Sequence, residues 1–425
     1  MPPYWNNVIK AYALSKNNAR EAILAFQSMR RCEAVPNEYT FPFLFKACSS
    51  FSGLNEGRQI HAHVFKHGLC SNLYVQNTMI HFYGSFKKIL DACKVFDEMS
   101  LRSVVSWNSV ITACVDCCWF DEAIGYFFKM RESGYWMDET TMVILLSACG
   151  EVGNLSRGRW VHSQVIVNGM VVNVQLGTSM VDMYGKCGAV DYARLVFDRM
   201  NFRSVWTWSA MILGLAQHGF AAEALEYFSQ MQLFKVTPNY VTFLGVLCAC
   251  SHAGLVEEGK RCLHNMEHVY KIKPQMAHYG AMVDIFGRAG ELEEAYAFIL
   301  RIRVKPDATI WRTLLSACTI HDVNDFSGIA EKVSRMLFEL EPRRCGNLVM
   351  VANRHAEVGS WEKAEQIRKK LRKRRLKKRA GESWLEVGGL MTKFFSGYDS
   401  QAVCEETLLL LERLILHMKM VSHEN

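Results

Sequence analysis

The chain has 425 residues, half of them hydrophobic, and a formal net charge of +7. No hydrophobic run approaches the roughly 20 residues that a membrane-spanning helix needs, which argues against an integral membrane protein. Nine of the eleven residues 369–379 are Lys or Arg, so the rest of the chain is nearly neutral. If the near-neutral remainder of the chain binds a polyanion, individually placed side chains would hold it more than a general basic field.

The sequence repeats itself at a fixed offset of 101 residues. The segment VFDEM at 95–99 returns as VFDRM at 196–200, VVSWNSVI from Val104 returns as VWTWSAMI from Val205, and LSACG from Leu146 returns as LCACS from Leu247. Self-similarity at a period of 20–50 residues is typical of solenoid proteins, and 101 residues divide into three related repeats of that size.

We divide residues 2–307 into nine repeats that form three triplets. Their ranges in chain order are 2–37, 38–72, 73–103, 104–138, 139–173, 174–204, 205–239, 240–275 and 276–307. Proline marks several of these borders, because Pro36, Pro238, Pro274 and Pro306 each stand one residue before a repeat ends.

The repeat 104–138 shows why each repeat is expected to be a helical hairpin. Val110, Ile111 and Cys114 give one apolar face, and Ala123, Phe127 and Met130 give a second at helical spacing. Asp121 and Glu122 stand where a helix begins, and Gly134 stands where a left-handed cap would end it. A hairpin of this kind completes its core only against its neighbours. The sequence therefore predicts an all-α fold, an α-solenoid of stacked helix-turn-helix repeats.

After residue 307 the pattern continues in a looser form. Helices are expected from Ala308 and over Phe326–Leu340, followed by a hairpin that starts at Gly346. The glycines and alternating apolar residues from Gly381 indicate a short pair of strands. A terminal helix is expected over Cys404–Met420, with Leu408, Leu411, Ile415 and Met418 on one face.

The fifteen cysteines form an odd number without disulfide-like spacing. Four of them recur beside Ala at the same place in the pattern: Cys48, Cys149, Cys250 and Cys318. We interpret these four as small core residues, which favours a reducing compartment over a secretory one.

Several motifs resemble those of plant pentatricopeptide repeat proteins of the PLS class. They are the triplet of 35, 35 and 31 residues, the Trp107–Asn108 pair, FPFLFKACSS, GRQIHAHVFKHG and MVDMYGKCGAVDYARLVFDRM. Residues 308–387, with WRTLLSAC, LEP and SWLEV in order, resemble the E region of that class, and residues 388–425 resemble a short E+ tail with a terminal helix. The resemblance implies an organellar RNA-binding protein that chooses cytidines for C-to-U editing.

In such repeats the fifth and last side chains together read one base. Carried over to this sequence, the resemblance implies base-reading pairs in the first and third repeats of each triplet: Asn6 with Asn37, Asn77 with Ser103, Asn108 with Asp138, Thr178 with Ser204, and Ser209 with Asn239. The ninth repeat departs from the pattern with Gly280 and Asp307. The middle repeats carry apolar residues at position five, namely Pro42, Val143 and Leu244.

A structural interpretation competes with this one at the last position. Ser, Asn or Asp directly before a helix is favoured as an N-cap, so capping alone explains the last residue of a repeat. At the fifth position, however, Asn, Thr and Ser are mediocre helix formers, and we see no requirement of the fold for them. We therefore interpret the fifth residues as a polar reading edge.

The family code, if it holds here, gives the footprint Y-n-C-U-n-A-A-n-n, read 5′ to 3′ in chain order. The edited C would lie a few nucleotides further 3′. The second residue of each repeat, such as Val105 or Val241, would flank the base by apolar contact, with ordinary interhelix packing as the alternative.

No catalytic or metal site is expected. A zinc deaminase needs His-x-Glu followed by Pro-Cys-x-x-Cys. The chain has only the fragments His355-Ala356-Glu357 and Cys114-x-x-Cys117, in the wrong order. The family's deaminase domain would follow the E region, where this sequence ends, so we expect a non-catalytic factor without cofactors that recruits a deaminase in trans.

The basic segment 369–379 has three interpretations. We favour phosphate contacts from Lys369, Lys370, Arg372, Lys373, Arg374, Arg375, Lys377, Lys378 and Arg379. A solvated helix face is the second interpretation, and a nuclear localisation signal is the third.

Two other functions stay open. One is organellar splicing, RNA stability or translation, and the other is a tetratricopeptide-like scaffold that binds peptides. An organelle is expected, with the mitochondrion preferred over the chloroplast. No Arg-rich, Ser-rich targeting segment is visible before the first repeat, so that segment is either absent or lost by truncation.

Overall fold

The computed structural model describes residues 2–15, 17–321, 327–373, 382–387 and 390–395, together with Arg413. The chain divides into two compact parts, the N-terminal part of residues 1–333 and the C-terminal part of residues 334–425. Among the helices that the structure describes, none combines the length and the hydrophobicity needed to cross a bilayer.

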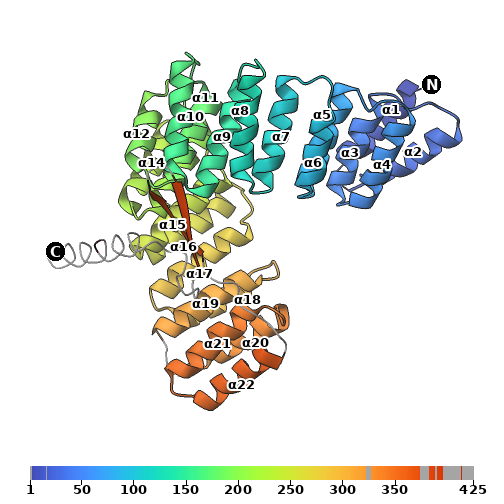
Figure 1. Ribbon diagram of the computed structural model, residues 1–425. Coiled ribbons are helices and arrows are strands. Elements are labelled where there is room, and N and C mark those ends of the chain that lie inside the picture. The colour runs from blue at the N-terminus through green and yellow to red at the C-terminus, as the bar shows by residue number, and fades with distance from the viewer. Residues whose placement is uncertain are drawn as a thin grey trace. The chain divides into compact units, whose positions relative to one another are not determined.

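The N-terminal part consists of helical hairpins in series (Figure 1). The described residues form the pairs α1 (Pro2–Leu14) and α2 (Glu21–Arg31), α3 (Thr40–Ser50) and α4 (Leu54–Lys66), α5 (Leu73–Ser85) and α6 (Ile89–Asp97), α7 (Val104–Asp116) and α8 (Phe120–Glu132), α9 (Glu139–Val152) and α10 (Leu155–Val167), α11 (Val174–Lys186) and α12 (Val190–Arg199), α13 (Val205–Gln217) and α14 (Ala221–Leu233), α15 (Tyr240–Ala253) and α16 (Val256–His268), α17 (Met276–Arg288) and α18 (Leu292–Arg301). Then come α19 (Ala308–His321) and the start of α20 (Ile329–Leu340). Each of the nine pairs lies within one predicted repeat, while the grouping into triplets stays a prediction.

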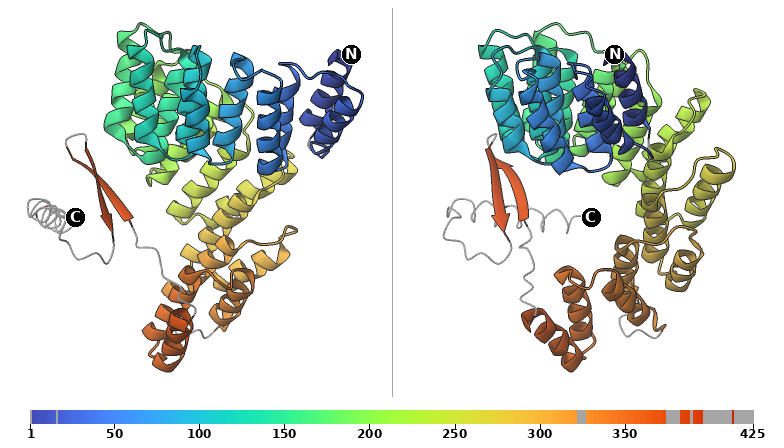
Figure 2. Two further views of the ribbon diagram at one scale, coloured as in Figure 1. Left: turned by 45° about the vertical axis from the view of Figure 1, so that its right-hand side comes forward. Right: turned by 90° about the vertical axis from the view of Figure 1, so that its right-hand side faces the viewer.

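The first helices of the repeats form a continuous row. Each odd-numbered helix from α1 to α17 packs against the next odd-numbered helix. The even-numbered helices pack against their own partner and the following first helix, and for α4 this second contact is made by side chains, with Nδ1 of His61 2.8 Å from the Tyr83 hydroxyl on α5. The views in Figure 2 show the hairpins of this part following one another in chain order. Because the main contacts join neighbours only, the prediction of an α-solenoid is confirmed.

The hairpin of α7 and α8 has the core that the sequence predicts. Val110, Ile111 and Cys114 on α7 are fully buried, and so are Ala123, Phe127 and Met130 on α8. The α8 helix starts with Asp121 and Glu122 in its first turn. Gly134 follows its end with φ +78°, the left-handed conformation that favours glycine.

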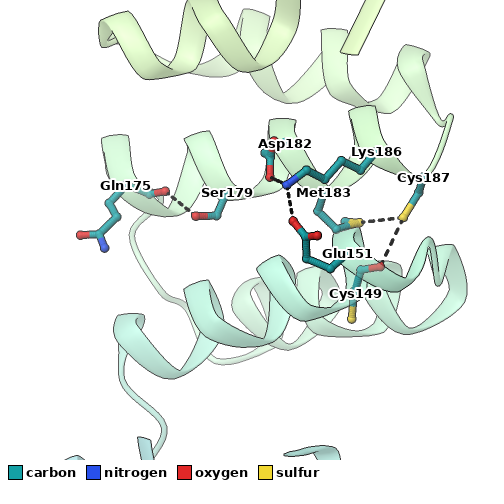
Figure 3. Close-up of polar contacts among 8 residues, drawn as sticks. All are labelled: Cys149, Glu151, Gln175, Ser179, Asp182, Met183, Lys186 and Cys187. Atoms are coloured by element: carbon teal, nitrogen blue, oxygen red, sulfur yellow. Dashed lines mark hydrogen bonds and ion pairs between the residues drawn. The ribbon is translucent and has the colours of Figure 1, made fainter. Parts of the chain in front are cut away.

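Polar contacts between repeats supplement this apolar packing. Lys186 on α11 bridges Glu151 on α9 and Asp182 on its own helix, each at 2.8 Å (Figure 3). The three side chains are 35–60% exposed. Since an exposed ion pair contributes about 0–1 kcal/mol, the stack depends mainly on its buried residues.

The four recurrent cysteines are core residues, as expected. Cys48, Cys149, Cys250 and Cys318 are buried and are not part of a disulfide. Burial raises the pKa of Cys48 to about 12 and that of Cys250 to about 11. Neutral, inaccessible thiols of this kind act as small apolar side chains.

The C-terminal part contains the end of α20, a helical hairpin and a strand pair. The hairpin is formed by α21 (Cys345–Glu357) and α22 (Trp361–Lys373). The strands β1 (Glu382–Val387) and β2 (Leu390–Phe395) pair antiparallel, with Glu382 opposite Phe395 and Val387 opposite Leu390. Both predictions for these segments are confirmed, whereas the expected helix Cys404–Met420 lies outside the described residues.

The neighbouring side chains of Phe127 and Phe128 allow a test of the stacked core. Phe127 is fully buried, and Phe128 on the next position of α8 is 44% exposed. We expect Phe127→Ala to lower the free energy of unfolding by about 3–5 kcal/mol, because it leaves a cavity in the core. Phe128→Ala is the matched control and should cost clearly less. Equal shifts of the urea midpoint, followed by circular dichroism, would contradict this packing.

Candidate nucleic-acid interface

The last residue of a repeat caps the first helix of the next repeat. The side chain of Asp138 accepts a hydrogen bond from the backbone N–H of Thr141 at 2.8 Å, and that of Asn239 accepts one from Thr242 at 2.9 Å. Ser204 receives the equivalent bond from Thr207 at 3.3 Å. The capping role expected for the last position is therefore present.

The fifth residue of three repeats joins this cap. The amide of Asn108 donates to Oδ1 of Asp138 at 3.0 Å, and its Oδ1 accepts from the Thr141 hydroxyl at 2.7 Å. The fifth residue, the capping residue and the third residue of the next repeat thus form a hydrogen-bonded set, which we call the junction triad.

The triad recurs in the first repeats of the other two triplets. Asn6 donates to Asn37 at 2.9 Å and accepts from Thr40 at 2.7 Å. Ser209 donates to Asn239 at 3.1 Å, and its hydroxyl lies 2.7 Å from that of Thr242.

The third repeats of the triplets depart from this arrangement. The Thr178 hydroxyl lies 2.7 Å from that of Thr207, which in turn lies 3.1 Å from the capping Ser204, so the pair is joined through a third residue. In the described part of the chain, Oδ1 of Asn77 is buried without a hydrogen-bond partner, and Ser103 bonds to Ser106 instead.

The ninth repeat has no fifth side chain. Gly280 has open space around it, since an added Cβ would meet only Ile310, at 3.8 Å. Asp307 still caps α19 by accepting from the N–H groups of Thr309 and Ile310, each at 3.0 Å. The structure thus provides a cap at this junction but no pair.

The view that the fold places no demand on the fifth position is wrong for these repeats. Asn108 is 7% exposed and Ser209 is 1% exposed, and both satisfy buried polar partners. A buried apolar replacement would remove one hydrogen bond from each of those partners. Structure alone therefore accounts for part of the polarity that the sequence attributes to base reading.

The triad at Asp138 also leaves an acceptor available at the surface. All three bonds that Asp138 accepts go to Oδ1, which leaves Oδ2 on an exposed side chain. Asn108 uses one of its two amide hydrogens. At the Ser209 junction, by contrast, Nδ2 of Asn239 is buried and has no hydrogen-bond partner among the described residues. A planar base edge could therefore meet the acceptor Oδ2 at the Asp138 junction.

The pKa of Asp138 is consistent with these hydrogen bonds. Burial opposes charge on the carboxyl, but hydrogen bonds from the Thr141 N–H, the Asn108 amide and the Thr141 hydroxyl together hold its pKa below the usual value. The carboxylate is therefore charged and held in one orientation at neutral pH.

The third residues of the repeats were missed by the sequence analysis. Five of them are completely buried at the junctions: Thr40, Ser106, Thr141, Thr207 and Thr242. The signal that could have found them is a Ser or Thr three residues after each Ser, Asn or Asp cap, the spacing of a capping box.

Second-position residues lie beside these junctions with exposed side chains. Val105 is 59% exposed, Trp206 is 51% exposed and Tyr74 is 53% exposed, so interhelix packing is not their main role. Val241 is half-buried. Exposed apolar and aromatic groups next to a polar edge suit contact with the face of a base.

The basic segment is only partly described. Lys369, Lys370, Arg372 and Lys373 lie on exposed positions of α22, and Glu365 lies 3.9 Å from Lys369 and 3.8 Å from Arg372. The predicted contacts of Arg374, Arg375, Lys377, Lys378 and Arg379 fall outside the described residues.

The two fragments of a deaminase signature belong to different compact parts of the chain. His355 is half-buried on α21, whereas Cys114 is buried on α7. Within the described ranges, no group of three or more His, Cys, Asp or Glu side chains is arranged to hold a metal ion.

Two family models match the sequence. The PPR repeat model matches residues 77–104, 105–135, 178–205, 206–236 and 277–305, and the E motif model matches residues 326–386. The five repeat matches coincide with first or third repeats of the proposed triplets, and none falls on a middle repeat.

Several proteins of Arabidopsis thaliana are similar along most of the chain. One pentatricopeptide repeat-containing protein is 55% identical over 402 residues, which cover 94% of this chain and 80% of that protein. Another, named as chloroplastic, is 39% identical over 98% of this chain, which spans about half of its length (51%). A third, named as mitochondrial, is 37% identical over 98% of this chain and 63% of its own.

A solved structure supports the fold. The pentatricopeptide repeat protein PPR10, in complex with an 18-nt psaJ RNA element, superposes with a TM-score of 0.52 at 18% identity. The match covers 88% of this chain and 61% of PPR10.

The lowered pKa of Asp138 predicts a pH-dependent contribution to stability. Since the folded-state pKa lies below the usual value of about 4, the contribution is complete at neutral pH and is lost as the pH falls through the folded pKa. Asp138→Asn should therefore destabilise the protein more at pH 7 than at pH 3, measured by urea unfolding. Asp198→Asn, at an exposed position of α12, is the control. If Asp138→Asn lowers the free energy of unfolding by the same amount at both pH values, the Asp138 carboxylate is not stabilised by these hydrogen bonds.

Proposed function

This chain belongs to the pentatricopeptide repeat protein family, and on that premise we propose that it is a sequence-specific single-stranded RNA-binding protein of an organelle that selects cytidines for C-to-U editing. The junction triads are the observation that carries the proposal. They hold the fifth and the last side chain of one repeat in contact, and at the Asp138 junction they leave one carboxylate oxygen without an intramolecular hydrogen bond on an exposed side chain. PPR10, which shares the fold, was crystallised with an RNA element.

The base-reading pairs are proposed as Asn6 with Asn37, Asn77 with Ser103, Asn108 with Asp138, Thr178 with Ser204, and Ser209 with Asn239. The repeating row of first helices places one junction per repeat along the solenoid. The middle repeats contribute Pro42, Val143 and Leu244, which offer no hydrogen bond to a base edge. The proposed footprint is Y-n-C-U-n-A-A-n-n, with chain order running 5′ to 3′.

The Asn108 and Asp138 pair gives the sharpest test of the code. We expect Asp138→Asn to change the preference at the fourth nucleotide from U to C, because the acceptor at the surface is replaced by an amide that also donates. Each variant would be titrated with two RNAs that differ only at that nucleotide. The unmodified chain should favour the RNA with U by roughly tenfold, and Asp138→Asn should favour the RNA with C by roughly tenfold, each a difference of about 1.4 kcal/mol in binding free energy.

A matched control is available in the adjacent repeat. Val143→Ala in the middle repeat 139–173 changes a fifth residue for which no base contact is proposed. It should leave the preference at the fourth nucleotide unchanged. If both variants weaken all RNAs equally, the pair is a structural cap and does not read a base.

The E motif match at residues 326–386 supports the assignment to editing over other outcomes of RNA binding. The 425 residues contain no His-x-Glu followed by Pro-Cys-x-x-Cys, the signature of a zinc deaminase. We propose that deamination is supplied by a second polypeptide in trans, recruited through the E region. The tetratricopeptide-like scaffold is not supported, since the family is now shown.

The basic residues of α22 are proposed to contact phosphates. Lys370 and Lys373 are exposed, and the basic charges exceed the nearby Glu365. Relatives named as chloroplastic and as mitochondrial support an organelle. We propose the mitochondrion, with the chloroplast as the alternative.

The experiment that tests the function is a survey of C-to-U conversion in organellar RNA from plants that lack this protein. We expect the loss of one or a few edited sites, each with the footprint a few nucleotides upstream and restored by the intact gene. Loss in mitochondrial transcripts would support that compartment. Unchanged editing with altered splicing or transcript ends would reject the editing role and favour the alternative function in RNA processing.

A further inference from the structure

A pocket of about 450 Å³ lies between the fifth repeat, 139–173, and the sixth repeat, 174–204. It is lined by residues of α10, α11 and α12 and of the connections that follow α10 and α12. The floor of the pocket includes two buried side chains, Met180 and Met200. The rim is apolar although it is exposed, and it is formed by Ile166, Val172, Leu195 and Phe202. Pockets that bind small molecules are commonly about 300–1,000 Å³ in volume and mostly apolar, with a few polar groups.

One cation without an ion-pair partner stands at this pocket. Arg199, the last residue of α12, lines the pocket, is exposed, and forms no hydrogen bond or ion pair with the other described residues. His162 also lines the pocket, with Nδ1 2.8 Å from the Tyr184 hydroxyl. Burial and the charge of Arg199 both lower the pKa of His162, so its imidazole is uncharged at neutral pH. Arg199 therefore supplies the positive charge, and the pocket combines an apolar rim with one site for an anion.

The same hollow is present 101 residues earlier, in the first triplet. A pocket of about 400 Å³ lies there, lined by residues of α4, α5 and α6. His61 and Tyr83 take the places of His162 and Tyr184, and their Nδ1 and hydroxyl are also 2.8 Å apart. The stacked repeats therefore form this hollow wherever the same packing recurs.

The lining of the two hollows differs in chemistry. In the first triplet, Lys94 stands in place of Leu195 and Glu98 stands in place of Arg199, and both line the pocket. The first triplet forms the same hairpins with these residues. The fold thus requires neither an apolar side chain at position 195 nor a cation at the end of α12, and packing alone does not explain them.

We propose that the pocket between the fifth and sixth repeats binds a small amphipathic carboxylate, with its hydrocarbon part over Met180 and Met200 and its carboxylate against Arg199. A guanidinium matches a carboxylate through two parallel hydrogen bonds. Asn201 also lines the pocket and brings an amide that can donate a further hydrogen bond. Removal of the apolar rim from water adds to the affinity. The binding needs no RNA, so the site stands or falls independently of the proposed function.

The first test titrates the whole chain with octanoate and, separately, with octanol by calorimetry. We expect one octanoate per chain, bound more tightly than octanol by roughly tenfold, because octanol lacks the charge. Arg199→Glu should weaken octanoate by roughly tenfold and leave octanol nearly unchanged, whereas Leu195→Lys should weaken both. Each variant carries the residue that stands 101 positions earlier, where the hairpins form with it.

Glu98→Gln, in the hollow of the first triplet, is the matched control for these titrations. It should leave the affinity for octanoate unchanged. Octanoate that shows no saturable binding, or that binds the unmodified chain and Arg199→Glu equally, would overturn the proposal.

A second measurement locates the ligand by NMR of the whole chain with labelled methionine methyl groups. Octanoate should shift the signals of Met180 and Met200. Met79 and Met99 are buried at the corresponding positions of the first triplet, and their signals should stay in place. Equal shifts of all four signals would show that octanoate enters the stacked core without preference, and the proposal would fail.

Sedimentation velocity distinguishes a small ligand from a second copy of this chain on the apolar rim. We expect the unmodified chain and Leu195→Lys to sediment alike at every concentration, because the rim is open to the ligand. A concentration-dependent dimer that Leu195→Lys abolishes would assign the rim to contact between copies and overturn the proposal.

Discussion

The hydrogen bond between a capping residue and the first turn of the next helix is the interaction on which the rest of the structure depends. At Asp138 it satisfies a backbone N–H that the helix cannot satisfy itself, and it fixes the side chain at the border of two repeats. The same oxygen also accepts a hydrogen bond from the side-chain amide of Asn108 on the preceding first helix. One residue thus starts a helix, joins two repeats and orients the group proposed to meet a base.

The solenoid converts this local bond into a periodic surface. Because each first helix packs against the next, successive junctions follow one another along the N-terminal part. Polar triads are formed by the first repeats of the three triplets, and a looser version is formed at Thr178 and Ser204. The apolar fifth residues between them interrupt the edge. In the proposed function, the spacing of the base-reading positions is set by packing, and the base preferred at each position is set by two side chains.

The sequence predicted the fold closely because the signals are local. The helix from Ala308, the left-handed Gly134 and the strands after Gly381 each depend on residues within a few positions. The triads escaped prediction because Asn108 and Thr141 are 33 residues apart, and only the stacked fold shows that they touch. For the same reason the sequence explained the fifth position by function alone.

The central claim is that the first and third repeats of the triplets read bases while the middle repeats do not. The most direct measurement is a selection of bound RNAs from a pool randomised over nine nucleotides. The account predicts enrichment at the first, third, fourth, sixth and seventh nucleotides, and little at the second, fifth and eighth. Equal enrichment at every position, or a preference that follows the middle repeats, would contradict it, because Pro42, Val143 and Leu244 offer no polar group to a base.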